Sequence, residues 1–430
     1  MRRYPFKLLP QILRGQSART INARIQTTVR LRFAILALVV LSVGGAGQAL
    51  AQTSAAQPMC GAVITASTKL AGDLTDCPGD GIVIGADNIS LDLNGHTVDG
   101  DGASGVLGPD IGIRNDGFDG ITVEGGSVQE FDFGIRITDV AGNSLLRLLS
   151  TLNSRAGIRT EGSEGGRLVG NKAVANGTFG IILFGENHDN LVRENTAADN
   201  GGGGVGDFVS SRDRIVHNVI SGNGEEGIAI GGSSDSSVEQ NSVSENFGGI
   251  VVFGSDRNTV AGNHVFRNRD NIIVDGDDNS VLANHVSDAL GCDDGEGCGF
   301  GISVEGGARN LVARNLVAST LHSGIRLDAY GAPVSDNVFR SNIVHAAGVD
   351  GIAIDGDHAG PVLDTLLEGN LVTAANDDGL DVDSPSTTLT GNLALHNGDL
   401  GIEAVAGVID GGKNHAHGNG NPAQCVNITC

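Results

Sequence analysis

A short phrase, Gly-Ile-x-Val or a close variant, recurs roughly once every 22–24 residues through most of this 430-residue chain. A second phrase, apolar-x-x-Asn, alternates with it. A period of this size with short apolar segments is typical of a solenoid, because no repeat can bury its own apolar side chains and neighbours must stack. Copies of the first phrase begin at Gly180, Gly227, Gly249, Gly301, Gly324, Gly351 and Gly379, and the second places Asn at 171, 195, 218, 241, 263, 284, 315, 342, 370 and 392.

Each repeat offers three short strands joined by turns at Asn and Gly, and none holds the ten or more residues of helical period that a helical solenoid needs. We therefore predict an all-β fold, a right-handed parallel β-helix of three sheets over residues 81–415. Residues 52–80 lack the repeat and are expected to form an N-terminal cap, and residues 416–430 a C-terminal tail. We interpret the repeated asparagines as inward-facing turn residues whose amides hydrogen-bond along the stack.

Residues 1–51 differ in composition from the rest of the chain. They carry eight Arg or Lys and no acidic residue, followed by an apolar stretch at 33–43 and small residues up to Ala51. This order is typical of a secretory signal peptide, and the apolar stretch is too short to span a bilayer. We predict cleavage near Ala51, a secreted or periplasmic protein, and no membrane span after cleavage.

Loss of the signal peptide changes the formal charge from −24 to −24 − 8 = −32. Such a charge disfavours nucleic acid and anionic membranes as partners and favours cations. We expect a monomer. All six cysteines lie in the exported part, where an oxidising compartment permits disulfides. Six cysteines allow 15 connectivities, and proximity in the sequence favours Cys60–Cys77, Cys292–Cys298 and Cys425–Cys430.

Because they consist of repeated coils of three short strands joined at Asn and Gly, residues 81–415 resemble the pectin-lyase-like family of parallel β-helix proteins. That family includes polysaccharide lyases, galacturonan hydrolases, uronan epimerases and non-catalytic periplasmic or surface proteins, so the resemblance implies the fold and leaves the activity open. The segment Asn376-Asp377-Asp378-Gly379 is similar to the Asn-x-Asp motif of the galacturonan hydrolases. Phe300, however, stands where their Gly-His-Gly segment has His, and the two motifs occur in reverse order.

Carboxylates recur at one outward position in five consecutive coils. Stacked coils lie about 4.8 Å apart, and unit charges at that spacing repel by roughly 3–4 kcal/mol at an effective dielectric of about 20. Closely spaced carboxylate oxygens suit Ca²⁺, so we predict a calcium site here. The predicted ligands are Asp275, Glu305, Asp328, Asp355 and Asp383.

The same coils carry other groups able to do chemistry. The Asn spacing lengthens to 31, 27 and 28 residues between positions 284 and 370, which predicts loops that wall a groove. Arg326 and Tyr330 alternate onto the outward face, and His322 lies just upstream. We predict Tyr330 or His322 as the base that removes a proton beside a uronate carboxylate, with Arg326 and Asp381 binding the substrate.

The leading hypothesis is an exported protein that acts on an acidic uronate polysaccharide as a lyase or epimerase, assisted by Ca²⁺. One alternative is a glycoside hydrolase that uses two of these carboxylates. Another is a non-catalytic module, favoured by the lack of Trp and the scarcity of Tyr. Met59 is the only methionine beyond the signal peptide, which argues against a copper-handling role built on thioethers.

Overall fold

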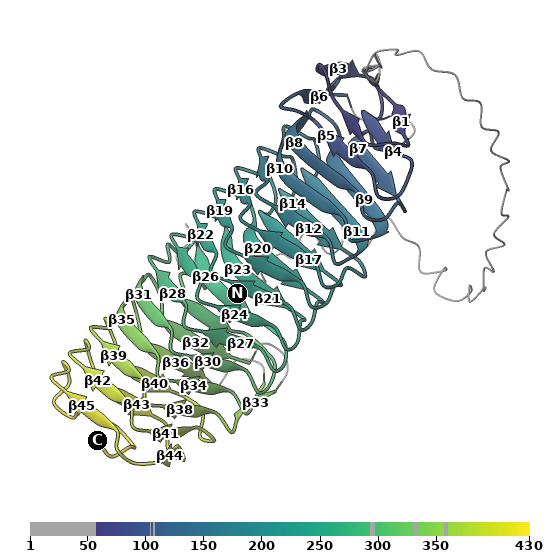
Figure 1. Cartoon of the computed structure of the whole chain (residues 1–430). Helices are drawn as coiled ribbons and strands as arrows, with labels where there is room; N and C mark the ends of the chain where they lie inside the picture. Colours follow the sequence, from purple (N-terminus) through teal and green to yellow (C-terminus); the bar gives the residue numbers. More distant parts are fainter. Residues whose placement is uncertain (1–56, 104, 106–107, 293–296, 330–332, 357–359) are drawn as a thin grey trace, which may run out of the picture. The chain divides into compact units, whose positions relative to one another are not determined.

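The computed structural model describes residues 57–430 except 104, 106–107, 293–296, 330–332 and 357–359. Every regular element in this part is a β-strand, and every strand pairs in parallel with a strand of a neighbouring coil (Figure 1). The predicted right-handed parallel β-helix is therefore confirmed, with about 15 coils. The predicted signal peptide at 1–51 lies outside the described residues.

One face of the solenoid is a 15-stranded sheet, here called sheet A, to which each coil contributes one strand. Its strands are β1 (Ala62–Ile64), β4 (Ile82–Ile84), β7 (Ile111–Asp116), β9 (Phe133–Ala141), β11 (Ile158–Glu164), β14 (Ile181–Phe184), β17 (Val205–Phe208), β20 (Glu226–Gly231), β23 (Gly248–Phe253), β26 (Asp270–Val274), β29 (Ile302–Val304), β32 (Ile325–Asp328), β36 (Ile352–Asp355), β40 (Leu380–Val382) and β43 (Ile402–Ala404).

Two further ladders complete each coil, and the long strands β8 (Thr122–Gln129) and β10 (Ser144–Thr151) belong to both. The first ladder holds β2 (Thr68–Lys69), β5 (Ser90–Asp92), β12 (Arg167–Val169), β15 (Leu191–Arg193), β18 (Arg214–Val216), β21 (Ser237–Glu239), β24 (Thr259–Ala261), β27 (Ser280–Leu282), β30 (Leu311–Ala313), β34 (Val338–Arg340), β38 (Leu366–Glu368), β41 (Thr388–Thr390) and β44 (Ile409–Asp410). The second holds β3 (Leu74–Cys77), β6 (Thr97–Gly100), β13 (Lys172–Val174), β16 (Thr196–Ala198), β19 (Val219–Ser221), β22 (Ser242–Ser244), β25 (His264–Phe266), β28 (His285–Ser287), β31 (Leu316–Thr320), β35 (Ile343–Ala347), β39 (Leu371–Thr373), β42 (Leu393–Leu395) and β45 (His415–His417). A small separate sheet joins β33 (Val334–Ser335) to β37 (Val362–Leu363).

The Gly-Ile-x-Val phrase forms the strands of sheet A. Its two aliphatic residues point inward and are fully buried, as Ile325 and Leu327 are on β32. Each is in register with its counterpart on the next coil, so that Ile325 lies against Ile352. The core is thus a stack of like side chains, and the alternate positions of each strand point outward.

The repeated asparagines are structural, as predicted. In a typical case, Asn218 Nδ2 donates to Asn241 Oδ1 on the next coil at 2.9 Å and to the Val192 carbonyl at 3.0 Å. The residue before each asparagine turns the chain with a positive φ, 56° at His217 and 62° at Gly262. A buried amide without such partners would be costly, so these rows serve the coil and leave no free group for chemistry.

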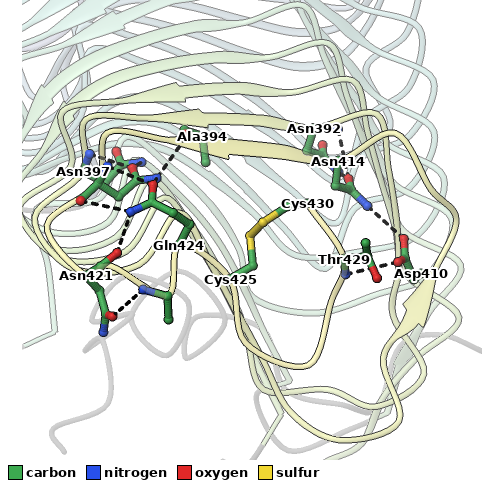
Figure 2. The surroundings of a disulfide bond; sticks show 12 residues. Asn392, Ala394, Asn397, Asp410, Asn414, Asn421, Gln424, Cys425, Thr429 and Cys430 are labelled. Atoms are coloured by element: carbon green, nitrogen blue, oxygen red, sulfur yellow. Dashed lines mark hydrogen bonds between the residues drawn. A yellow bond between two sulfur atoms is a disulfide. The ribbon is translucent and has the colours of Figure 1, made fainter.

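All three predicted disulfides are present. At the N-terminal end, β1 and β3 of the segment expected to form a cap pair with β4 and β6 and make the first coil. At the other end, Figure 2 shows the Cys425–Cys430 disulfide beside the last coil. There, Gln424 Oε1 accepts hydrogen bonds from the backbone N and the Nδ2 of Asn419, at 3.1 and 2.9 Å.

Candidate functional site

The outward side of sheet A gathers carboxyl groups between β26 and β43. Strand alternation and register carry those on the strands outward in rows, one of which runs from Arg326 through Ala353 and Asp381 to Glu403. Asp350 and Asp378 lie just before their strands, β36 and β40. We call this surface the acidic face. Its carboxyl residues are Asp270, Asp275, Glu305, Asp328, Asp350, Asp355, Asp378, Asp381, Asp383 and Glu403.

The five predicted calcium ligands share one row of the acidic face. Asp328 lies in register with Asp355. Asp275, Glu305 and Asp383 each directly follow a buried valine, and these valines are in register with the buried residues that precede Asp328 and Asp355. Their surroundings differ, because Asp328 is fully buried whereas Asp275 and Asp383 are exposed. Among the described residues, the groups of three or more potential ligands whose atoms lie within 4.8 Å of one another involve other carboxylates. A metal bound by this row remains a prediction.

Arg326 lies within the acidic face and is already neutralised. Its Nη2 donates to Asp328 Oδ2 at 2.5 Å, and its Nε donates to Asp355 Oδ2 at 2.5 Å. Its side chain is 12% exposed, and the guanidinium carbon lies 4.8 Å from the centre of the Phe300 ring. Because two carboxylates occupy its donors, Arg326 is placed to hold this face together. Its predicted contact with a substrate carboxylate stays a prediction.

His322 packs beside Arg326, with its ring centre 4.5 Å from that of Phe300. Its Nδ1 accepts a hydrogen bond from the Ser323 backbone N at 2.9 Å, which places the proton of the neutral ring on Nε2. Burial, and then the positive charge of Arg326, lower the pKa of His322. A neutral imidazole can accept a proton at neutral pH. Tyr330, the other predicted base, lies outside the described residues.

Three carboxyl groups converge at the C-terminal end of the acidic face. Oxygen atoms of Asp378, Asp381 and Glu403 all lie within 4.8 Å of one another. The register of β40 and β43 sets Asp381 against Glu403. Asp378 precedes β40, is only 4% exposed, and accepts a hydrogen bond from the Leu400 backbone N at 2.7 Å. We call these three residues the carboxyl triad.

Burial and mutual repulsion keep part of this region protonated. Burial raises the pKa of Asp378 to about 8, and a hydrogen bond to Glu403 adds to the effect. Burial, and then the charges of Asp350 and Asp383, raise the pKa of Asp381 to about 7. At neutral pH, Asp378 thus holds a proton and Asp381 exchanges one readily. Carboxyl groups tuned in this way are typical of acid–base sites.

A second group of perturbed carboxyls lies on the other side of Arg326. Burial, and then the charge of Asp270, raise the pKa of Glu305 to about 7. Burial also raises the pKa of Asp270 to about 6, although its Oδ1 accepts hydrogen bonds from the backbone N atoms of Gly299 and Phe300, at 2.7 and 2.9 Å. The acidic face therefore has two protonatable patches with Arg326 between them.

The sequence hypothesis anticipated only part of this site. It named Asp381 as a substrate-binding residue and Asp378 within a motif, but it omitted Glu403 and Asp350. Glu403 continues the row of Asp381 one coil further, so extending that row would have found it. The predicted groove walls fall on insertions that include 293–296, 330–332 and 357–359, outside the described residues. Across the described part of the chain, no helix has the length and apolarity to cross a bilayer.

Comparison with known proteins gives one family match. The family model described as "Periplasmic copper-binding protein (NosD)" matches residues 88–285, 203–355 and 249–419, which together cover most of the chain. No curated protein matches the chain.

Several solved structures share the general architecture. The mannuronan C-5 epimerase AlgE6 A-module of Azotobacter vinelandii is 15% identical, with a TM-score of 0.42 over 81% of this chain and 88% of that one. A GH87 α-1,3-glucanase catalytic unit from Streptomyces thermodiastaticus is 14% identical, with a TM-score of 0.47 over 81% and 61%. The periplasmic alginate epimerase AlgG is 14% identical, with a TM-score of 0.42 over 70% and 72%. At such identities and TM-scores, none of them assigns an activity to this chain.

Proposed function

The chain belongs to the NosD family, described as periplasmic copper-binding proteins, and we propose that it is an exported β-helix enzyme that acts on a polysaccharide. The observation that carries the proposal is the carboxyl triad. Closely spaced carboxyl groups, some of them protonated at neutral pH, are what hydrolysis of a glycosidic bond requires. The three disulfides fit an oxidising compartment outside the cytoplasm.

The three members of the triad have different roles in this proposal. Asp381 donates its proton to the glycosidic oxygen, and the exposed Glu403 attacks the anomeric carbon as a carboxylate. The buried Asp378 is a positioning residue that holds Glu403 by a hydrogen bond. Oxygen separations within 4.8 Å are nearer the about 5–5.5 Å of retaining glycosidases than the about 6.5–9.5 Å of inverting ones. The expected reaction is therefore hydrolysis with retention of configuration.

The geometry also supports a second candidate, a calcium-assisted lyase or epimerase acting on uronate. His322 is a neutral base beside Arg326, and the oxygens of the carboxyl triad suit Ca²⁺, which would bridge them to a uronate carboxylate. In this reaction His322 or Tyr330 removes the proton next to the carboxylate. The engagement of Arg326 with two carboxylates makes this candidate the weaker one.

Copper, which the family description names, fits these residues poorly. All six cysteines are in disulfides, and Met59, 79% exposed near the N-terminal end, is the only methionine in the described part. The potential metal-binding groups found there contain carboxylates alone, without His or Cys. Copper prefers imidazole or sulfur, whereas carboxylate oxygens suit Ca²⁺.

The test is to incubate the mature protein with a panel of neutral and uronate polysaccharides. Release of reducing ends indicates hydrolysis, ultraviolet absorbance of unsaturated products indicates a lyase, and NMR of the intact polymer detects epimerisation. Asp381→Asn should lower the rate about 10²–10⁴-fold, the usual contribution of a general acid. Asp275→Asn, at the exposed far end of the face, is the matched control and should retain full activity. Binding without any change in the polymer would instead identify a non-catalytic module.

A further inference from the structure

Two carboxyl groups lie inside the solenoid, on coils remote from the carboxyl triad. Asp207 on β17 is in register with Leu183 and Ile230, so it stands in an inward row that is aliphatic on both neighbouring coils. Asp213 follows Asn190 in another interior row and takes the place of an asparagine. Both side chains are fully buried. Two departures from the repeat therefore occur together on one coil.

The two carboxyl groups are incompletely paired. Both oxygens of Asp207 and Oδ2 of Asp213 are buried without a hydrogen-bond partner. Only Asp213 Oδ1 is satisfied, by the backbone N and Nδ2 of Asn190 at 2.7 and 3.0 Å. The hydroxyls of Ser210 and Ser236 act on Asp207 at close range, and so does the carboxyl group of Asp213, but none of these contacts gives the three oxygens a hydrogen bond of accepted geometry. An ionised carboxylate in such surroundings needs a proton or a positive charge.

The nearest basic side chain of the described residues, Arg212, interacts electrostatically with Asp213, but it is exposed and forms an ion pair with Asp189 at 2.7 Å. Burial raises the pKa of Asp207 to about 6, and hydrogen-bonding contacts with Ser210, Ser236 and Asp213 oppose that rise. Burial, and then the negative charge of Asp207, raise the pKa of Asp213 to about 8. The two carboxyl groups therefore lie close enough together in the interior to act on each other.

A surface hollow borders the same coil. It encloses about 590 Å³ and is lined by successive turns of the solenoid, with Asp139, Glu164 and Glu186 among the residues around it. These carboxylates attract cations. Ser210 also lines the hollow, and it is the residue whose hydroxyl acts on Asp207. The hollow and the buried pair thus share one small side chain.

We propose that Asp207 and Asp213 bind one divalent cation inside the solenoid, with the hydroxyls of Ser210 and Ser236 as further oxygen ligands. Two carboxylates balance a divalent charge, and the three unpartnered oxygens become ligands. A donor set made only of oxygen suits Ca²⁺ better than a softer metal. The site is independent of the proposed function, since it lies on β17 and the turn that follows, far along sheet A from β40 and β43.

The test compares the mature protein with a double variant, Asp207→Leu and Asp213→Asn. Each substitution introduces the residue found one coil earlier, Leu183 or Asn190, so the variant is designed to keep the scaffold. Each protein is treated with EDTA, dialysed against Ca²⁺ and desalted, and bound metal is measured by mass spectrometry. Thermal unfolding is then recorded with Ca²⁺ and with EDTA.

The wild type should retain one Ca²⁺ per chain and gain several degrees in Tm. The double variant should lose both, whereas Asp381→Asn, in the carboxyl triad, should keep both. Equal Ca²⁺ content and Tm gain in the wild type and the double variant would overturn the proposal, as would a wild type with neither. If the double variant does not fold, Asp213→Asn alone decides: a Ca²⁺ affinity at least tenfold weaker supports the site, and an unchanged affinity overturns it.

Discussion

Replacing Arg326 by methionine tests whether this residue holds the acidic face together. The substitution keeps much of the length of the side chain but removes both ion pairs, to Asp328 and to Asp355. Asp328, which is fully buried, then loses its cationic partner. We expect a large loss of stability rather than a simple loss of substrate binding.

The magnitude follows from burial. Removing one partner of a buried ion pair costs about 3–5 kcal/mol, because the other charge stays behind without compensation. This cost applies to the pair with Asp328, which is 0% exposed, whereas the pair with Asp355, which is 24% exposed, contributes less.

The assay is denaturant unfolding followed by circular dichroism. Arg340→Met is the matched control, because Arg340 pairs with Glu368 at the surface, where the two side chains are 50% and 43% exposed. An exposed pair contributes about 0–1 kcal/mol. The double variant Arg326→Met with Asp328→Asn should recover part of the loss. If Arg326→Met is no more destabilising than Arg340→Met, Arg326 does not hold the acidic face together, and the predicted contact with a substrate carboxylate becomes the better explanation of its place there.

Three further predictions follow from the interior and from the carboxyl triad. Asn241→Ala removes four hydrogen bonds, two accepted by Oδ1 and two donated by Nδ2, and should lower the unfolding free energy by about 4–6 kcal/mol; the outward-facing Ser242→Ala should change it by less than about 0.5 kcal/mol. The raised pKa of Asp378 means that the folded protein holds a proton that the unfolded chain releases above about pH 4, so this residue should make stability fall by up to about 1.4 kcal/mol per pH unit from about pH 5 to pH 8. Unfolding of Asp378→Asn should show that slope reduced, and an unchanged slope would mean that Asp378 is ionised in the folded state. If the protein hydrolyses a glycan, NMR of the first product should show the anomeric configuration of the substrate, and inversion would exclude Glu403 as the nucleophile.

The fold was predictable from the sequence because its determinants are periodic and local. The Gly-Ile-x-Val phrase marks the strands of sheet A, and the Asn phrase marks the turns that hydrogen-bond from coil to coil, as Asn218 does with Asn241. Aligning the copies therefore yields the register, and with it the row that contains Asp328 and Asp355. The disulfides were predictable for a similar reason, since each joins cysteines that are close in the sequence.

The site was less predictable because it depends on which side chains meet. Alternation places Arg326 and Asp328 on one face but does not reveal that they neutralise each other. Asp378 lies on a turn before β40, where alternation does not set side-chain direction, and its approach to Glu403 appears only in three dimensions. The coil of Asp207 departs from the phrase, with Val205-Gly206-Asp207 in place of the usual apolar pattern. Comparing copies for their common residues passes over such an exception.

The hydrogen-bonded row of asparagines that runs from Asn171 to Asn414 points in one direction along the solenoid. It starts where Asn171 Oδ1 accepts a hydrogen bond from the Leu148 backbone N, and each amide then donates toward the next coil. At its far end, Asn414 Nδ2 donates to Asp410 Oδ1, a group of the last coil itself. The row is thus closed at both ends, with no amide left to recruit another molecule. Inserting or deleting a whole coil would preserve this closure, whereas removing the chain from Asp410 onward would open it and favour end-to-end polymerisation.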